Sequence, residues 1–125
     1  SDEMEFPNGI VLSPDQKWIY VASSDMKDPK MWRFSAENGT GKIFFDGPFA
    51  ESDAGWFDGM KMHKSGNIFA TGPGGVIVIS PEGKKLATVK LPDPVTNCCF
   101  DENQEYLYLT SFAYVARFKM KQQRP

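Results

Sequence analysis

Three oxygen-bearing side chains stand at matching places in the sequence, each just before a short run of strand-forming residues: Asn8, Asp58 and Thr96. Amide and carboxylate oxygens are the donors that hard cations take, and Ca²⁺ needs about 6–8 of them. The same positions also have a conformational interpretation, because Asn8-Gly9 and Asp58-Gly59 are common turn dipeptides and a threonine hydroxyl often caps a turn. The choice depends on whether the fold brings the three positions together.

The surroundings of these positions form an internal repeat. Each copy begins with a short polar lead, continues as a strand and a tight turn, and ends in a more apolar strand. The starts, at residues 8, 58 and 96, are 50 and 38 positions apart. Periods near 40–50 residues with four strands each are typical of β-propeller blades. Equivalent blade entrances converge on the central channel of a propeller, so the repeat predicts that the three side chains face one axis.

Strand signals are dense along the chain, and no apolar stripe with helical spacing is sustained. The predicted strands have these bounds: 9–12, 18–23, 30–35, 41–45, 59–63, 68–71, 75–80, 85–90, 97–100, 106–110 and 114–120. They predict an all-β fold of three four-stranded blades, half of a six-bladed propeller, although the last blade has only three of these strands and its fourth strand has no assigned residues. A β-sandwich is the alternative, because it also has short strands with regular turns. It does not explain why one strand–turn–strand unit recurs three times in phase.

The domain prediction is a partial propeller over residues 1–125, with blades at roughly 5–50, 51–91 and 92–122. Propellers typically close with about 4–8 blades, so three blades leave sheet edges and faces open. We therefore expect a partner that closes the ring, either a missing N-terminal half or a second copy of the chain.

Composition limits the other partners. The net charge of −2 argues against nucleic acid, which needs a clustered positive surface. No stretch approaches the roughly 20 apolar residues of a membrane helix, and no secretory signal stands at residue 1. We expect a soluble protein without a membrane partner; the sequence does not decide between the cytoplasm and the periplasm. His63 is the single histidine and falls at a strand end beside an outer turn, which disfavours a Ser-His-Asp triad.

Several short motifs, taken in order, resemble the gluconolactonase, senescence-marker-protein and luciferin-regenerating-enzyme-like family. The motifs are Phe6–Asp15 with its Pro-Asn-Gly opening, Asp58-Gly59-Met60, the stretch 66–76, Asn97–Phe100 and Tyr106–Thr110. Each motif is weak alone, but their order and spacing together are specific. The similarity covers nearly the whole chain and corresponds to the C-terminal half of a six-bladed propeller.

The resemblance implies one divalent cation on the propeller axis, with Asn8 and Asp58 as two of its ligands. It also implies that Asp58 is the catalytic residue, as general base or as the group that positions the attacking water. The glutamate ligand of the family has no counterpart in this chain. Ca²⁺ is the expected cation, with Zn²⁺, Mg²⁺ or Mn²⁺ as alternatives. Trp56 and Phe57 beside Asp58, together with Thr96, are candidates for the substrate pocket.

The function that the resemblance implies is hydrolysis of a sugar-derived or similar lactone by a cation-activated water. A second interpretation is a non-catalytic propeller fragment or interaction module, because the half that carries the glutamate ligand is missing. A third keeps the fold and changes the substrate, giving a phosphotriesterase-like hydrolase with an axial cation. The sequence leaves these alternatives open.

Overall fold

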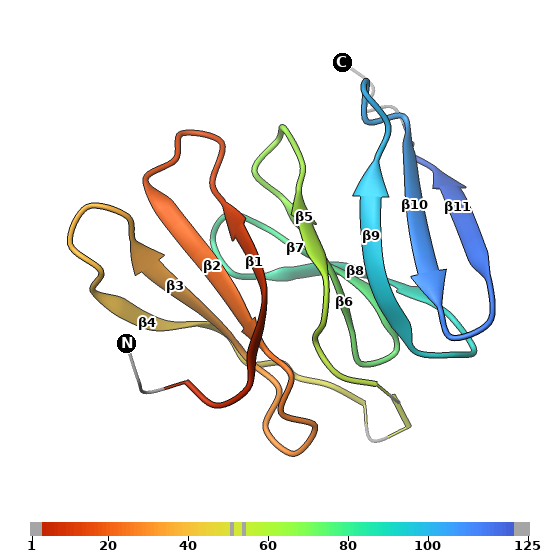
Figure 1. The fold of residues 1–125 in the computed structure, drawn as a ribbon, viewed down its shortest axis with the longest axis horizontal. Coiled ribbons are helices and arrows are strands. Elements are labelled where there is room, and N and C mark those ends of the chain that lie inside the picture. The colour runs from red at the N-terminus through yellow and green to blue at the C-terminus, as the bar shows by residue number, and fades with distance from the viewer. Residues whose placement is uncertain (1–3, 51, 54, 122–125) are drawn as a thin grey trace.

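The computed structural model describes residues 4–50, 52–53 and 55–121, which form three antiparallel sheets (Figure 1). The first sheet contains β1 (Pro7–Leu12), β2 (Trp18–Ser23), β3 (Met31–Ser35) and β4 (Gly41–Phe45). The second contains β5 (Met60–Met62), β6 (Ile68–Gly72), β7 (Gly75–Ile79) and β8 (Lys85–Lys90). The third contains β9 (Val95–Phe100), β10 (Tyr106–Ser111) and β11 (Val115–Lys119). Within each sheet, strands that follow one another in the chain are neighbours.

The all-β architecture predicted from the sequence is confirmed. Each predicted strand is present, and its ends differ by no more than two residues from the observed ones. The third sheet has three strands in the described part of the chain, where the repeat predicted four. The predicted fourth strand of that blade is therefore not among the described residues. The described residues also contain no helix with the length and apolar character needed to cross a bilayer.

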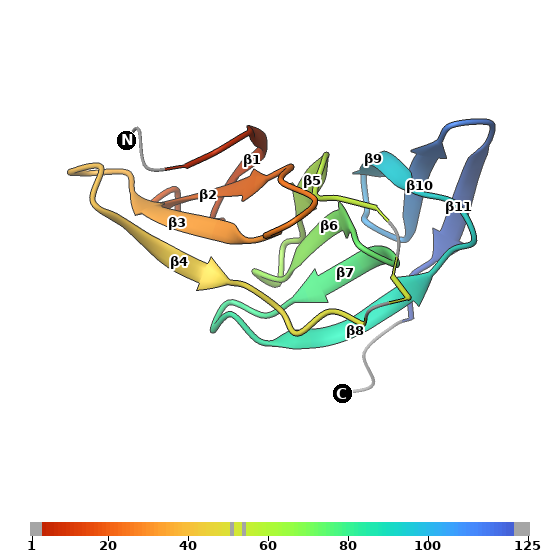
Figure 2. The ribbon, with the colours of Figure 1, turned by 90° about the horizontal axis from the view of Figure 1, so that it is seen from below.

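The three sheets are arranged like blades around a common side. β1 packs beside β5, and β5 beside β9, so the first strand of each sheet lies at the inner edge. Figure 2 shows β1, β5 and β9 along one side of the molecule, with β4 and β8 along the opposite side. The start of each inner strand is therefore the part of the sequence that meets its counterpart in the next blade.

The middle sheet is covered on both faces. All residues of β6 and β7 are buried. Because successive residues of a strand point to opposite faces, Ile77 and Ile79 join the core shared with the first sheet. Val76 and Val78 join the core shared with the third. A continuous apolar run in the sequence therefore marks the one blade that has a neighbour on each side.

His63 belongs to the contact between the second and third blades. Its ring lies 5.4 Å from the ring of Phe100 and 5.9 Å from that of Phe69, measured between centroids. Its Nδ1 accepts a hydrogen bond from the Ser65 backbone N–H at 3.1 Å. Burial, and next the charge of Lys64, lower the pKa of His63 from its ordinary value of 6.5. The side chain is a packing residue between blades in its neutral form.

Replacing Ile79 by Ala should lower the free energy of unfolding by about 2–5 kcal/mol, because the side chain is fully buried between two blades and its loss leaves a cavity. Ile79→Val should cost only about 0.5–1.5 kcal/mol. Urea unfolding monitored by tryptophan fluorescence measures both. Leu86→Ala in the adjacent β8 is the control, since this leucine is 55% exposed and should cost little. Equal losses at positions 79 and 86 would contradict the assigned core.

Acidification should weaken the fold through His63. Because its pKa is lowered in the folded state, the unfolded chain binds the proton more readily. The contribution to stability is complete above pH 6.5 and falls as the pH drops from 6.5 through the lowered pKa. His63→Asn retains a side-chain acceptor for the Ser65 N–H without a titrating group. Unfolding free energies at pH 7.5 and pH 5 should show a larger loss for the parent protein than for this variant. Equal losses of unfolding free energy in the parent protein and in His63→Asn would refute the role of His63.

Candidate functional site

Asn8 lies in an irregular part of β1. The register between β1 and β2 shifts between Pro7 and Ile10, so that Asn8 and Gly9 lie opposite the single residue Ala22. An extra residue of this kind is a β-bulge, which bends the strand and changes the direction of its side chains. The Pro-Asn-Gly motif thus begins a strand and also interrupts its regular pairing.

A hydrogen-bond relay ties the Asn8 side chain to the next blade. The Asn8 Nδ2 donates to Ser24 Oγ at 2.9 Å, and the Ser24 hydroxyl donates to the Phe57 carbonyl oxygen at 2.7 Å. Phe57 directly precedes Asp58. Because the amide nitrogen is engaged, the orientation of the amide is defined. Among the described residues, the Asn8 Oδ1 accepts no hydrogen bond.

Two glycines set the spacing of the blade entrances. A Cβ atom on Gly9 would lie 2.1 Å from the Asp58 carbonyl oxygen, and one on Gly59 would lie 2.1 Å from Asn97 Oδ1. The Gly59 N–H also donates to the Thr96 carbonyl at 3.0 Å. The backbone after residue 8 therefore contacts residue 58, and the backbone after residue 58 contacts residues 96 and 97. The three positions aligned by the repeat follow one another along the inner edge.

Asp58 is held in place by Thr71 at the end of β6. The Asp58 N–H donates to the Thr71 carbonyl at 3.1 Å. In return, the Thr71 N–H and hydroxyl donate to the Gly59 carbonyl at 3.0 and 2.7 Å. Thr71 is fully buried and has both its backbone and its hydroxyl engaged in these contacts. Asp58 is thus fixed by backbone bonds and remains half-buried, with its carboxylate in no hydrogen bond to the described residues.

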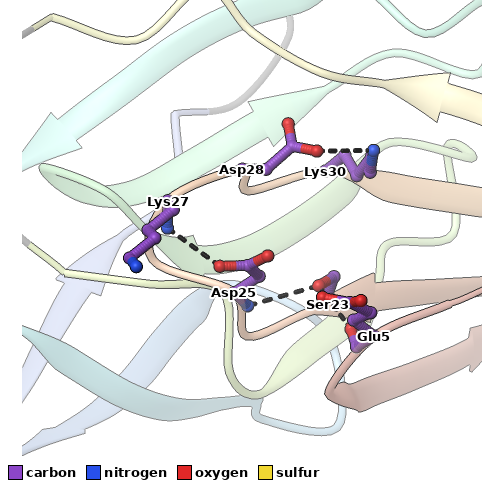
Figure 3. A network of polar contacts seen from close by, with 6 residues as sticks. All are labelled: Glu5, Ser23, Asp25, Lys27, Asp28 and Lys30. Carbon is purple, nitrogen blue, oxygen red and sulfur yellow. Dashed lines mark hydrogen bonds and ion pairs between the residues drawn. The ribbon is translucent and has the colours of Figure 1, made fainter.

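The segment before Asn8 is anchored to the last residue of β2, as Figure 3 shows. The Ser23 hydroxyl donates to the Glu5 carbonyl at 2.7 Å, and the Asp25 N–H donates to that hydroxyl at 3.2 Å. The Asp25 carboxylate accepts from the Lys27 N–H at 3.0 Å. These hydrogen bonds restrain the segment that carries Ser24, the middle residue of the relay.

Of the three residues predicted to line a substrate pocket, Phe57 lies in the core. It is fully buried, and its ring is 5.9 Å from that of Phe49 and 6.4 Å from that of Phe45. Its side chain presents no surface to a substrate in this structure, which differs from the role predicted for it. The sequence showed an aromatic residue in a polar loop, but the loop folds back onto the core between the first two blades.

Trp56 and Thr96 remain nearer the surface. Trp56 is half-buried, and its ring lies 6.0 Å from that of Phe112 in the turn between β10 and β11. Thr96 Oγ1 lies 2.9 Å from Thr110 Oγ1. The threonine hydroxyl is thus paired across β9 and β10, which is a different role from the turn capping of its conformational interpretation. Sequence reasoning missed Phe112, although an aromatic residue in a predicted turn was a usable signal.

The residues present provide part of a cation site. Asn8 and Asp58 offer oxygen donors of the type that a hard cation takes, and the backbone contacts place them in adjacent blades. Within the described ranges, no group of three or more His, Cys, Asp and Glu side chains is arranged to hold a metal ion. A nearby hollow of about 220 Å³ along β9 is lined by Lys61, Asn97 and Cys99, with Asn8 and Asp58 outside it. Any complete shell needs further oxygen atoms.

Antiparallel sheets that share an inner edge, with polar residues at the start of each inner strand, define a β-propeller type of protein. Residues 1–113 match the family described as SMP-30/Gluconolactonase/LRE-like region. The chain belongs to this family.

Curated relatives and solved structures agree with this assignment. The chain is 36% identical over 124 residues to a gluconolactonase of Zymomonas mobilis, covering 92% of this chain and 35% of the relative. It is 31% identical to regucalcin of Danio rerio, covering 91% and 40%. The solved structure of a gluconolactonase of Xanthomonas campestris is 26% identical, with a TM-score of 0.75, covering 86% of this chain and 36% of that one. The chain therefore spans little more than a third of the length of these proteins.

Replacing Gly9 by Ala should separate the first two blades at their inner edge. The new methyl group would overlap the Asp58 carbonyl, which is backbone and cannot rotate away, so a loss of about 2–3 kcal/mol in unfolding free energy is expected. Chemical denaturation measures it. Gly39→Ala is the control, because an added Cβ meets no atom within 4 Å there and only its left-handed φ of +75° is strained, at about 1 kcal/mol. A variant at position 9 that is as stable as the control would overturn the close approach.

Proposed function

We propose that this chain is part of a metal-dependent lactonase, which hydrolyses a sugar-derived or similar lactone. The observation that carries this proposal is the placement of Asn8 and Asp58 in adjoining blades, linked through Ser24 and through the Gly9 contact. Family membership and the similarity to gluconolactonases support it.

The proposed mechanism assigns separate tasks to the two residues. The Asn8 Oδ1 and the Asp58 carboxylate would hold a divalent cation, which when bound polarises the lactone carbonyl and lowers the pKa of a water molecule. Asp58 accepts a proton from the attacking water as the new C–O bond forms. The ring C–O bond then breaks, and the departing oxygen takes up a proton to give the open hydroxy acid. Ser24 keeps the Asn8 amide in the orientation that presents its oxygen.

We propose Ca²⁺ as the cation. Both donors are oxygens, which Ca²⁺ and Mg²⁺ prefer, whereas Zn²⁺ sites usually include nitrogen or sulfur. A solved relative from Agrobacterium tumefaciens is described as a calcium-binding protein, regucalcin. Zn²⁺, Mg²⁺ and Mn²⁺ are the competitors in the test below.

We also propose that further blades complete the propeller and its cation shell. The face of the first sheet turned away from the second carries one apolar side chain from each strand in register. The row is Ile10, Val21, Trp32 and Ile43. Ile10 is 65% exposed and Ile43 45% exposed, so this row resembles a core that is open on one side.

The two outer faces differ in chemistry. The corresponding face of the third sheet carries Tyr108 paired with Arg117, and Tyr106 paired with Lys119. The Arg117 guanidinium lies 4.5 Å from the centroid of the Tyr106 ring. A ring of two identical copies would place the apolar row against these cationic side chains, which would be costly to desolvate. This difference favours a separate N-terminal half as the completing partner over a second copy.

The alternatives predict different results for the same sample, which is the chain together with the blades that complete the propeller. A phosphotriesterase-like hydrolase would use the same two residues on another substrate, and an interaction module would bind no cation at this position. D-Glucono-1,5-lactone and an aryl phosphotriester are therefore assayed side by side, with Ca²⁺, Zn²⁺, Mg²⁺ and Mn²⁺ added separately. Calorimetry with each cation reports binding independently of turnover.

Asp58→Asn should lower lactone hydrolysis at least about 100-fold, because it removes the proton acceptor and the single carboxylate of the proposed pair. It should also weaken Ca²⁺ binding in calorimetry. Asp93→Asn is the control, since Asp93 is an exposed carboxylate outside the site. Unchanged lactone hydrolysis in Asp58→Asn would refute the assignment. If the parent protein hydrolyses the phosphotriester but not the lactone, and Asp58→Asn loses the phosphotriester activity, the phosphotriesterase-like alternative is favoured.

A further inference from the structure

The turn between β10 and β11 carries an exposed aromatic side chain that its own segment does not explain. Phe112 and Ala113 are the central residues of this turn. The Ser111 N–H closes the turn by donating to the Tyr114 carbonyl at 2.9 Å. Turn centres usually hold Gly, Pro, Asn, Asp or Ser, each for a conformational reason that phenylalanine does not share. Phe112 is also 67% exposed, so it adds little to the core, and contact with a ligand is the remaining role for such a loop residue.

This turn is fixed to the entrance of the third blade. The Ser111 hydroxyl donates to the Pro94 carbonyl at 2.8 Å, and Ser111 lies opposite Val95 at the start of β9. The β10–β11 turn therefore lies at the same end of the molecule as the segments that lead into β5 and β9, along the lower edge of Figure 1. Asp58 belongs to the segment that leads into β5 and lies at this end too.

Phe112 reaches across the gap between the second and third blades to Trp56. Their ring centroids are 6.0 Å apart, and the ring planes are inclined by 35°. Trp56 is half-buried, so the two rings form an aromatic surface that is open to solvent. Tyr106 and Tyr108 lie on the outer face of the third sheet, which is a different surface. A blade that completes the propeller on that outer face therefore packs elsewhere than on the aromatic pair.

The aromatic pair is within reach of a substrate held at Asp58. Trp56 is two residues before Asp58, and two residues of extended chain span at most about 7 Å. The same gap between blades closes next to Asp58, where the Gly59 N–H donates to the Thr96 carbonyl at 3.0 Å. A chain of five carbon atoms spans about 6 Å at similar bond geometry. A substituent of that length on a lactone ring at Asp58 can therefore lie on the two rings.

We propose that Trp56 and Phe112 bind an alkyl substituent of the lactone and so determine which lactones are preferred. This inference rests on the proposed function and names the substituent that the same site selects on the ring. Neither side chain carries a charge, and their rings give an apolar surface on which an alkyl chain leaves water. The transfer of each CH₂ group from water corresponds to up to about fourfold in affinity.

The kinetic test compares δ-decalactone with δ-valerolactone, two six-membered lactones that differ only in a pentyl chain on the ring. The sample is the chain together with the blades that complete the propeller, with Ca²⁺ added. The kcat/KM of δ-decalactone should be higher by at least about tenfold, since this needs roughly two CH₂ groups to leave water. Phe112→Ala should lower the ratio of the two kcat/KM values at least about fivefold. Phe112→Leu retains apolar surface and should restore much of the ratio.

Leu86→Ala is the control for these variants. It also removes an exposed apolar side chain, but on β8, which is not part of the aromatic pair. The ratio of the two kcat/KM values should not change in this control. Because Phe112 is exposed, Phe112→Ala should keep the urea midpoint of the parent protein, which separates a loss of contact from a loss of folding.

Binding of the corresponding lactams distinguishes failure of this proposal from failure of the proposed function. 6-Pentylpiperidin-2-one should shift the ¹⁵N indole signal of Trp56 to saturation, and piperidin-2-one should bind at least about tenfold more weakly. Phe112→Ala should weaken binding of the pentyl lactam. If neither lactone is hydrolysed but the pentyl lactam behaves in this way, the lactonase proposal fails and the aromatic contact stands.

Three outcomes would overturn the aromatic contact. The first is an equal kcat/KM for the two lactones when both are hydrolysed. The second is a Trp56 indole signal that the pentyl lactam does not shift. The third is an equal change of the kcat/KM ratio in Phe112→Ala and Leu86→Ala.

Discussion

The inner edge of this molecule depends on one steric constraint, the approach of the Gly9 backbone to the Asp58 carbonyl at a distance that leaves no room for a Cβ atom. Gly59 repeats the constraint against the third blade. Because the glycine contacts set the spacing between blades, the Asp58 carboxylate enters no hydrogen bond to the described residues, and Asn8 uses only its amide nitrogen, toward Ser24. The donor oxygens of both side chains thus take no part in holding the blades together.

The sequence pattern predicted the architecture well because strands and turns are governed by local chemistry. Alternating or continuous apolar runs and turn residues located every strand to within two residues. The repeat also aligned Asn8, Asp58 and Thr96, and the structure places their backbones next to one another. An internal repeat contains tertiary information, since equivalent residues in equivalent blades must occupy equivalent places.

The details of the site could not be predicted from the sequence, because they depend on contacts between residues that are far apart in the chain. Ser24 has no special context in its own segment, and its role appears only when Asn8 lies on one side and the Phe57 carbonyl on the other. Phe57 looked like a pocket residue from its neighbours, yet the folding back of its loop buries it beside Phe49. Hydrophobicity favours the burial of any aromatic side chain, but the path of the loop decides which aromatic residue is buried.

The burial of the middle blade on both faces has a consequence for the dynamics of the chain. Its strands β6 and β7 are shielded by a neighbouring sheet on each face, whereas within the described residues the first and third sheets each have one neighbouring sheet. Backbone amides exchange with solvent deuterium through openings whose cost follows local burial. The slowest amides should therefore lie in the middle blade and the fastest at the two outer margins, so that the molecule opens from its sides inward.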